Sequence, residues 1–419
     1  MPLDRLNSAL RYFSVVACVL AMHACTTAQP PIPGVTATGA AAGSAVLPLV
    51  FIPGLMGSML KDSAGRTRWL TAGEGLGLKT PDLGLPLNWN DGVQQRDDLA
   101  PAGIVMDVSL IPGLIGQDVY APWADFATNI KDRPLHIFSY DWRRDNNESS
   151  ARFEEYLDQL SREYGGKKIQ VVAHSMGGMI TLSVMNRRPE LFDRVVFTGT
   201  PFRGGIGYLD NMYSGTPIGI NNSLLGPEVL FSHASVYSFY PAGQAFENTD
   251  IVQDETGAPL ALNFYDPAVW QANGFGPFAP ASTDWRGNAE ERLKFLSAVL
   301  KQGRLFRTAM LPKFAADKYP PVLVVGSKSH GTLAFTRRKP VSSSAGPKTE
   351  AKDPNIPEWD FANTTREAGD GTVRYRDMLP PEPIRHDVVL SKYSHSYLLN
   401  DPEMQTEIAR FLHATSEEH

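Results

Sequence analysis

Short apolar runs alternate with longer helical stretches over the first half of the chain. The apolar runs resemble buried strands bounded by turns, and we expect them at 47–52, 135–140, 169–173 and 194–198. Residues 148–164 space their apolar side chains as one face of a helix, and we expect further helices over 122–132 and 176–187. This alternation predicts parallel strands joined by crossover helices.

The alternation is interrupted twice. Residues 61–120 are rich in Gly, Pro and Asp with little period, which predicts an irregular excursion. Residues 200–320 are rich in Gly, Pro, Asn and aromatic residues, with one clear helical stretch at about 290–305, and we interpret them as an inserted cap. The sheet is expected to resume at 322–326, with a short strand at 388–390 and a closing helix over 402–413. The predicted core is therefore 46–199 together with 321–415.

The first 25 residues predict an export signal. Arg5 and Arg11 supply positive charge, residues 15–24 are apolar, and small residues lead to Cys25. Met22-His23-Ala24-Cys25 resembles a bacterial lipobox, which predicts lipidation of Cys25. Cys18 fits nearly as well, and an ordinary cleaved signal is the other alternative. Residues 26–45 predict a flexible tether. We therefore expect an exported protein, either a membrane-anchored lipoprotein of the cell envelope or a secreted one.

Charge and cysteine content narrow the function classes. The formal net charge is −6 and there is no basic stripe, which argues against nucleic acid as a partner. Both cysteines, Cys18 and Cys25, lie in the first 25 residues, so the rest of the sequence lacks a disulfide framework, a cysteine metal site and a cysteine nucleophile. His and carboxylate clusters at metal-ligand spacing are absent from the sequence, and we expect neither a metal nor a cofactor.

One segment carries a candidate nucleophile. Gln170-Val171-Val172-Ala173-His174-Ser175-Met176-Gly177-Gly178 runs from an apolar strand through a small-X-Ser-X-Gly turn into a helix. This is the pattern of a nucleophile elbow, which lifts a serine hydroxyl above a sheet at a helix N-terminus. A chance Ser-X-Gly turn is the alternative. Ser175 is therefore the candidate nucleophile, and we expect an α/β-hydrolase fold: a mostly parallel sheet flanked by helices, with the inserted cap over its active end.

A serine that attacks an ester creates an oxyanion, which needs two preorganised N–H donors. One is expected to be the backbone N–H of Met176, the residue after the serine. The second is expected from the turn Phe51-Ile52-Pro53-Gly54-Leu55-Met56-Gly57-Ser58, with Leu55 as the first choice and Met56 as the second. A plain turn that closes a strand is the alternative interpretation of these residues.

The acid and the base should follow the serine in the order that this fold uses. Asp370 is the preferred acid because Gly369 and Gly371 let the backbone turn and present its carboxylate, a setting that Asp360 and Asp377 lack. For the base, His395 lies between the last strand and the last helix, where this fold places its histidine. We favour His395 over His386, which opens a predicted strand.

Several segments together resemble the lecithin:cholesterol acyltransferase family, which includes lysosomal phospholipase A2 and the phospholipid:diacylglycerol acyltransferases. They span residues 47–413 in order, and His395 follows the last of them: Ile52-Pro53-Gly54-Leu55-Met56-Gly57-Ser58, Ser139-Tyr140-Asp141-Trp142-Arg143, Ala173-His174-Ser175-Met176-Gly177-Gly178, Ala234-Ser235-Val236-Tyr237 before Tyr240-Pro241, and Gly369-Asp370-Gly371-Thr372-Val373. The Tyr-Asp-Trp-Arg run is the most specific, because generic hydrolases lack it.

The resemblance implies a serine acyl hydrolase or O-acyltransferase that acts on phospholipid or acylglycerol esters at a membrane surface. Ser175 would form the acyl intermediate, and water or an alcohol or sterol acceptor would resolve it. The cysteines of the animal enzymes are missing here, so a disulfide-closed lid is not implied. Asp141-Trp142-Arg143 lies outside the triad of Ser175, Asp370 and His395. Both loop shaping and substrate contact stay open for it. The rival hypotheses are a carboxylesterase for smaller esters and a catalytically silent envelope lipoprotein that binds lipid.

Overall fold

The computed structural model describes residues 46–90, 92–111, 115–279, 285–340 and 356–414. The expected export signal with Cys25 and the expected tether over 26–45 lie outside these ranges. No helix in the described ranges combines the length and the apolar character needed to cross a membrane.

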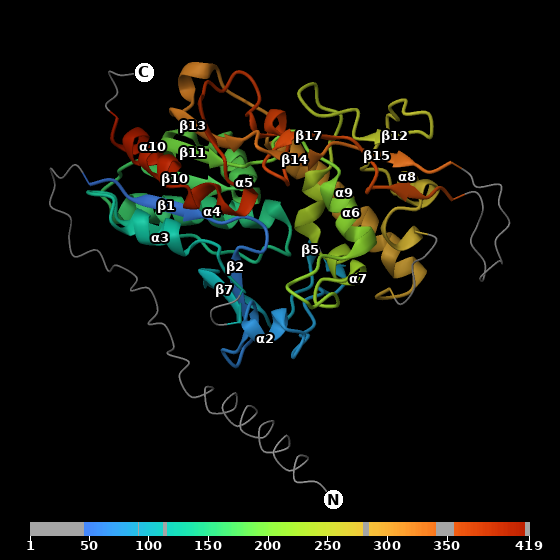
Figure 1. The fold of residues 1–419 in the computed structure, drawn as a ribbon. Helices are drawn as coiled ribbons and strands as arrows, with labels where there is room; N and C mark the ends of the chain where they lie inside the picture. Colours follow the sequence, from blue (N-terminus) through green and yellow to red (C-terminus); the bar gives the residue numbers. More distant parts are fainter. Residues whose placement is uncertain (1–45, 91, 112–114, 280–284, 341–355, 415–419) are drawn as a thin grey trace, which may run out of the picture. The chain divides into compact units, whose positions relative to one another are not determined.

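Six parallel strands form the central sheet (Figure 1). Their order across the sheet is β18 (Asp387–Ser391), β13 (Val322–Ser327), β11 (Phe192–Thr198), β10 (Ile169–His174), β1 (Leu49–Ile52) and β9 (Leu135–Ile137). Every neighbouring pair runs in parallel. All residues of β1, β10 and β13 are buried, as expected for strands covered on both faces.

Helices cover both faces of the sheet. Successive strand residues point to opposite sides, so they pack in two separate clusters. Phe51 and Val172 pack in one cluster with α3 (Ala121–Thr128) and α10 (Pro402–His413). Their chain neighbours pack in the other cluster with α4 (Asn146–Glu163) and α5 (Met176–Met185). This is the α/β-hydrolase arrangement that the sequence predicts. The 3₁₀ turn η2 (Pro189–Leu191) leads from α5 into β11.

Residues 61–120 differ from the irregular excursion expected from sequence. The segment contains α2 (Ala72–Gly75) and a set of short strands that mostly pair as antiparallel hairpins. The strands are β2 (Ser58–Lys61), β3 (Thr67–Trp69), β4 (Trp89–Asn90), β5 (Val93–Gln94), β6 (Ala100–Ile104), β7 (Asp107–Ile111) and β8 (Ile115–Asp118). Strands of two to five residues are too short to establish a period of two, so the sequence pattern does not reveal them.

Between β11 and β13 the chain leaves the sheet. The one helix expected there is α9 (Ala289–Ala309), whose N-cap Asn288 forms a capping box with Glu291. The structure adds shorter elements that the sequence pattern did not predict: α6 (Gly207–Ser214), α7 (Pro227–Phe231), η3 (Ala234–Phe239), β12 (Val252–Gln253), α8 (Pro267–Asn273), η4 (Gly276–Phe278) and η5 (Ala316–Lys318).

Short elements also follow β13. The strand β14 (His330–Leu333) pairs antiparallel with β17 (Arg366–Gly369), which leads directly to Asp370. The remaining elements are β15 (Thr336–Arg338), β16 (Trp359–Asp360), η6 (Tyr375–Met378) and η7 (His395–Asn400). Both β17 and η7 end up beside the carboxyl ends of the central strands, because Asp370 and His395 contact residues at that edge of the sheet.

Candidate active site

Ser175 stands at the turn between β10 and α5. Its backbone has φ 52° and ψ −122°, in the left-handed half of conformational space that non-glycine residues rarely adopt. Gly177 and Gly178 follow shortly after it, and neither position has room for a side chain. A Cβ on Gly177 would lie 2.5 Å from the carbonyl oxygen of Pro53, and one on Gly178 would lie 1.9 Å from Oγ1 of Thr200. The sharp turn therefore depends on close packing against two neighbouring loops.

Ser175, His395 and Asp370 lie in a hydrogen-bonded line. The Oγ of Ser175 is 2.9 Å from Nε2 of His395, and Nδ1 of His395 is 2.7 Å from Oδ2 of Asp370. In the neutral state Nδ1–H donates to the carboxylate and Nε2 accepts the serine hydroxyl. The backbone N–H of His395 also donates to the carbonyl of Asp370 at 2.9 Å, which ties the two loops together.

The sequence alternatives for acid and base lie in other environments. His386 contacts the carbonyl oxygen of Ile384 through Nδ1 at 3.0 Å. Asp377 pairs with Arg374 at 2.7 Å, and Asp360 accepts N–H groups of the turn that follows it. The structure therefore brings the preferred residues together with Ser175, and not these alternatives.

Asp370 is fully buried, yet its surroundings favour the carboxylate. Burial alone would raise the pKa of Asp370, but attraction to His395, the hydrogen bond from that ring and two backbone donors outweigh it and leave the pKa below its ordinary value. The backbone donors are the N–H groups of Val373 and Thr372, at 2.7 and 2.9 Å from Oδ1. The Gly-Asp-Gly turn thus supplies an ionised acceptor that fixes the orientation of His395.

The loop after β1 lies against the elbow. Leu55 and Met56 line the same cavity as Ser175, and Met56 has φ 64°. Met176 is the first residue of α5, so its N–H belongs to the first turn of that helix, where backbone donors have no partner within the helix. The expected oxyanion donors therefore come from the two segments that flank Ser175.

Side chains far apart in sequence hold this loop by its carbonyl groups. The hydroxyl of Tyr140 donates to the carbonyl of Pro53 at 2.9 Å, and the indole N–H of Trp69 donates to that of Met56 at 2.8 Å. The indole N–H of Trp142 donates to the carbonyl of Ser58 at 3.1 Å. Sequence analysis left the role of Trp142 open, and the structure places it, with Tyr140, in loop shaping.

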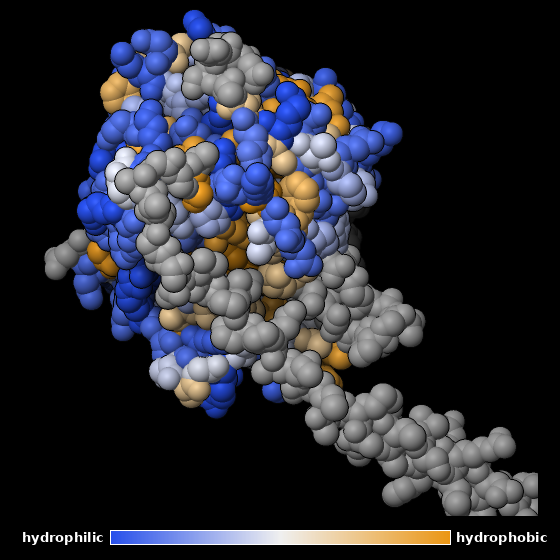
Figure 2. Space-filling model, turned by 90° about the vertical axis from the view of Figure 1, so that its left-hand side faces the viewer, coloured by the Kyte–Doolittle hydropathy of each residue, from blue (hydrophilic) through white to orange (hydrophobic). Residues whose placement is uncertain are grey.

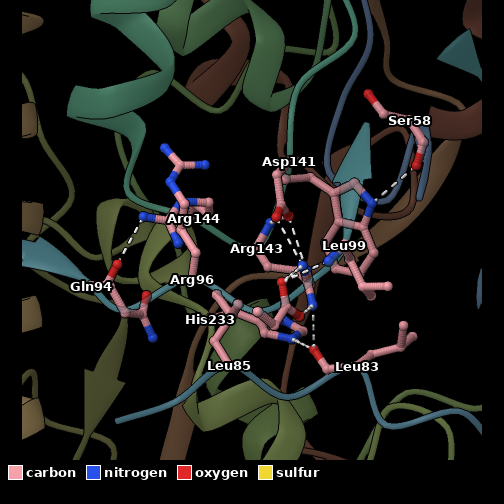
Figure 3. Close-up of polar contacts among 12 residues, drawn as sticks. Ser58, Leu83, Leu85, Gln94, Arg96, Leu99, Asp141, Arg143, Arg144 and His233 are labelled. Carbon is pink, nitrogen blue, oxygen red and sulfur yellow. Dashed lines mark hydrogen bonds and ion pairs between the residues drawn. The ribbon is translucent and has the colours of Figure 1, made fainter. Parts of the chain in front are cut away.

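Arg143 belongs to the same run and lies within a cluster of polar contacts (Figure 3). Its buried guanidinium donates to both carboxylate oxygens of Asp141 at 2.8 and 2.9 Å and to those of Asp97 at 2.6 and 3.0 Å. It also donates to the carbonyl of Leu83 at 3.2 Å, which accepts a second hydrogen bond from Nε2 of His233 at 3.0 Å. The cluster therefore joins the excursion, the segment after β9 and the segment between β11 and β13.

A cavity of about 600 Å³ opens above Ser175. Its walls come from the β1–β2 loop, the excursion, the segment between β11 and β13 and the loops after β17 and β18. They are mostly apolar: Leu55, Met56, Trp69, Leu70, Val105, Val119, Ile218, Phe239 and Leu333. Asp210 and Arg366 add charge to the lining. Figure 2 shows hydrophobic residues near the middle of the drawn face, with hydrophilic residues around them. Such a cavity accommodates an extended apolar group next to the serine.

No three His, Cys, Asp or Glu side chains in the described ranges gather closely enough to hold a metal ion.

The elbow on a parallel sheet, with its cavity and covering segment, defines the class as an α/β hydrolase. Among solved structures, the crystal structure of the Tle4–Tli4 complex matches with a TM-score of 0.56 at 16% identity, over 88% of this chain and 98% of that one, and it shares the fold. Residues 109–267 match the family model of lecithin:cholesterol acyltransferase. Over this segment the chain is similar to that family.

Two curated proteins are also similar to this chain. A putative phospholipid:diacylglycerol acyltransferase 2 from Arabidopsis thaliana is 30% identical over 159 residues, which are 32% of this chain and 23% of the relative. An uncharacterised protein of Saccharomyces cerevisiae is 25% identical over 251 residues, 59% of this chain and 36% of the relative. The matches thus span little more than a third, or less, of the relatives' own length.

Proposed function

We propose that the chain is a serine acyl hydrolase or O-acyltransferase that acts on lipid esters. The observation that carries the proposal is the hydrogen-bonded line of Ser175, His395 and Asp370 at the base of an apolar cavity. Similarity to the lecithin:cholesterol acyltransferase family over residues 109–267 supports a lipid substrate, since similar proteins are named as phospholipid:diacylglycerol acyltransferase and as lysosomal phospholipase A and acyltransferase.

In the proposed reaction, Oγ of Ser175 attacks the ester carbonyl carbon while its proton moves to Nε2 of His395. The N–H groups of Leu55 and Met176 receive the oxyanion, which is where the largest share of rate enhancement usually arises. His395 then passes its proton to the departing alcohol, and the acyl group stays on Ser175. Water or a second alcohol, deprotonated by His395, resolves this acyl-enzyme to fatty acid or to a new ester.

The apolar lining of the cavity favours a long acyl chain over a small ester. Burial of apolar surface contributes about 25 cal/mol per Å², so each methylene in contact with residues such as Leu70, Val119 and Ile218 adds affinity. We propose a phospholipid or acylglycerol at a membrane surface as the acyl donor and a long-chain alcohol or sterol as a candidate acceptor besides water.

The test uses the full-length chain and phosphatidylcholine vesicles labelled in one acyl chain, with and without a long-chain alcohol. We expect label in free fatty acid, or in the alkyl ester when the alcohol is present, and the ratio distinguishes hydrolysis from transfer. Ser175→Ala is the control. Equal label movement by Ser175→Ala and the wild type would show that another residue, or a contaminant, carries the activity.

A short-chain ester series separates this proposal from a small-ester carboxylesterase. We expect kcat/KM to rise with acyl length from butyrate to palmitate. A maximum at butyrate, with no release from vesicles, would favour the carboxylesterase. No turnover of any ester, together with no labelling by a fluorophosphonate, would favour a protein that binds lipid without cleaving it.

A further inference from the structure

A chain of hydrogen bonds runs from His395 to the loop over residues 53–57, called here the oxyanion loop because it carries the proposed donor Leu55. Nε2 of His174 lies 3.0 Å from the backbone carbonyl oxygen of His395. Nδ1 of the same ring lies 2.7 Å from the hydroxyl of Tyr120, and that hydroxyl accepts the backbone N–H of Gly54 at 3.1 Å. His174 directly precedes Ser175, and Gly54 directly precedes Leu55, so the chain reaches both sides of the attacking serine.

The direction of each hydrogen bond follows from the chemistry of the groups. A carbonyl oxygen only accepts, so Nε2 of His174 carries the hydrogen that points to His395. Burial, reinforced by the charge of His395, lowers the pKa of His174 to about 3, so the ring is neutral and Nδ1 is an acceptor. The hydroxyl of Tyr120 therefore donates to Nδ1, which leaves its oxygen free to accept from Gly54.

Packing makes this chain rigid. His174 is 6% exposed and Tyr120 is 2% exposed. A Cβ on Gly54 would lie 2.8 Å from Cβ of Ser175 and 3.0 Å from Nδ1 of His174, so the loop fits against the elbow without space to shift. The ring of Tyr120 also packs edge-on against Phe51 of β1, at 5.0 Å between centroids.

We infer that Tyr120 and His174 are positioning residues that set the oxyanion loop and the His395 loop at fixed places relative to Ser175. The inference rests on the proposed function. Its physical basis is the sensitivity of acyl transfer to geometry: the donors must meet the oxyanion at hydrogen-bond distance, and a displacement of ~1 Å can cost about 10²-fold in rate. Both residues line the cavity, and we expect them to act through their hydrogen bonds to Gly54 and His395.

Tyr120→Phe tests this chain of hydrogen bonds, because phenylalanine keeps the ring packing and removes the hydroxyl. We expect kcat on p-nitrophenyl butyrate to fall about 10-fold while KM stays within about twofold, because the geometry of the transition state suffers and ground-state binding does not. Affinity for a trifluoromethyl ketone, whose adduct with serine carries an oxyanion, should fall in parallel with kcat/KM. A purely structural role would not produce this parallel.

The protein contains a matched control in Tyr164, whose hydroxyl lies 2.9 Å from Nε2 of His136. Those rings also meet edge-on, at 5.6 Å, as the rings of Tyr120 and His174 do. Tyr164→Phe removes the same kind of hydroxyl–imidazole contact away from Ser175, and we expect it to leave kcat unchanged. An equal fall of kcat in Tyr164→Phe and Tyr120→Phe would overturn the inference.

A double-mutant cycle adds a test of connection. His174→Gln keeps a donor that can reach the carbonyl of His395 and loses the acceptor for Tyr120. If the two residues act as one chain, the combined loss of kcat in Tyr120→Phe/His174→Gln is smaller than the product of the single losses. Losses that multiply, or a Tyr120→Phe variant within twofold of wild-type kcat, would overturn the inference. A wild-type chain that neither turns over esters nor reacts with a fluorophosphonate would instead overturn the proposed function.

Discussion

The indole N–H of Trp142 donates a 3.1 Å hydrogen bond to the backbone carbonyl of Ser58, at the far end of the loop that carries Leu55 and Met56. The backbone N–H of Tyr140 donates to Oγ of the same serine at 3.1 Å. Trp142 is fully buried, so the carbonyl that it reaches has little access to water. The tryptophan therefore fixes the end of the loop after β1 from within the core.

Trp142→Phe should lower both stability and kcat. The buried carbonyl of Ser58 would lose its partner, which costs about 1–3 kcal/mol, and the loop would lose its fixed end. Urea unfolding and ester turnover measure the two effects. Trp359→Phe is the matched control, because Trp359 is buried and donates to the carbonyl of Asn273 at 2.7 Å, outside the cavity lining. It should lose comparable stability and keep kcat. A Trp142→Phe enzyme with full kcat would exclude a role in shaping the loop.

Asp370→Asn should leave substrate binding intact and lower kcat by roughly 10⁴, as loss of the carboxylate does in serine triads generally. The amide cannot stabilise the imidazolium that forms when His395 takes the serine proton, and it favours the wrong tautomer of the ring. Steady-state kinetics on a soluble ester would measure the loss. Asp360→Asn, which changes an aspartate outside the line, is the control. If both variants kept wild-type kcat, Asp370 would have no place in the mechanism.

Gly178→Ala should damage the elbow itself. The added methyl group would overlap Oγ1 of Thr200, at 1.9 Å, and Thr200 is buried with no room to retreat. Overpacking in a core costs about 1–3 kcal/mol, and the displaced helix would move Met176 and Ser175. Thermal unfolding and fluorophosphonate labelling report the two effects. Gly178→Ala/Thr200→Ala removes Oγ1 and Cγ2 of Thr200, the two closest atoms at 1.9 and 2.7 Å, and should recover part of both. Full labelling in the single variant would show that the elbow tolerates the methyl.

The sequence pattern predicts those elements whose signal is a regular spacing of apolar residues or a short run of consecutive residues. The central strands and α4, α5 and α10 follow from short periodic runs, and the elbow follows from nine consecutive residues. Asp370 and His395 carry local signals as well, since flanking glycines mark the first and the position between the last strand and helix marks the second. The structure then brings them to Ser175 across 195 and 220 positions of the chain.

What sequence did not reveal depends on contacts between distant residues that have no local pattern. Tyr120 sits at the start of a helix as an ordinary apolar residue, and only folding places its hydroxyl against His174 and Gly54. The same holds for Trp69, which reaches the oxyanion loop from a three-residue strand. The cap helices α6, α7 and α8 are five to eight residues long, too short for a helical period to emerge among their glycines and prolines.

Asp145 gives the chain a predicted pH dependence of stability. It is the N-cap of α4, accepting the backbone N–H of Asn147 at 3.0 Å. Burial raises the pKa of Asp145 to about 6, although hydrogen bonds from Asn147 oppose the shift. The ordinary pKa of the group is 3.8, so between about pH 4 and pH 6 the folded state binds more protons than the unfolded state. Stability should therefore fall as pH rises through that window.

A pKa that moves from 3.8 to about 6 on folding corresponds to roughly 2–3 kcal/mol at pH 7, since a tenfold change in proton affinity is about 1.4 kcal/mol. Asp145→Asn keeps an oxygen that caps the helix and removes the ionisation. We expect the free energy of unfolding of the wild type to fall relative to Asp145→Asn by this amount from pH 4 to pH 7, measured by urea titrations at intervals. Asp145→Ala also removes the window but loses about 1 kcal/mol at every pH, because the cap is lost. Parallel stability curves for the wild type and Asp145→Asn would show that Asp145 is ionised at no cost in the folded protein.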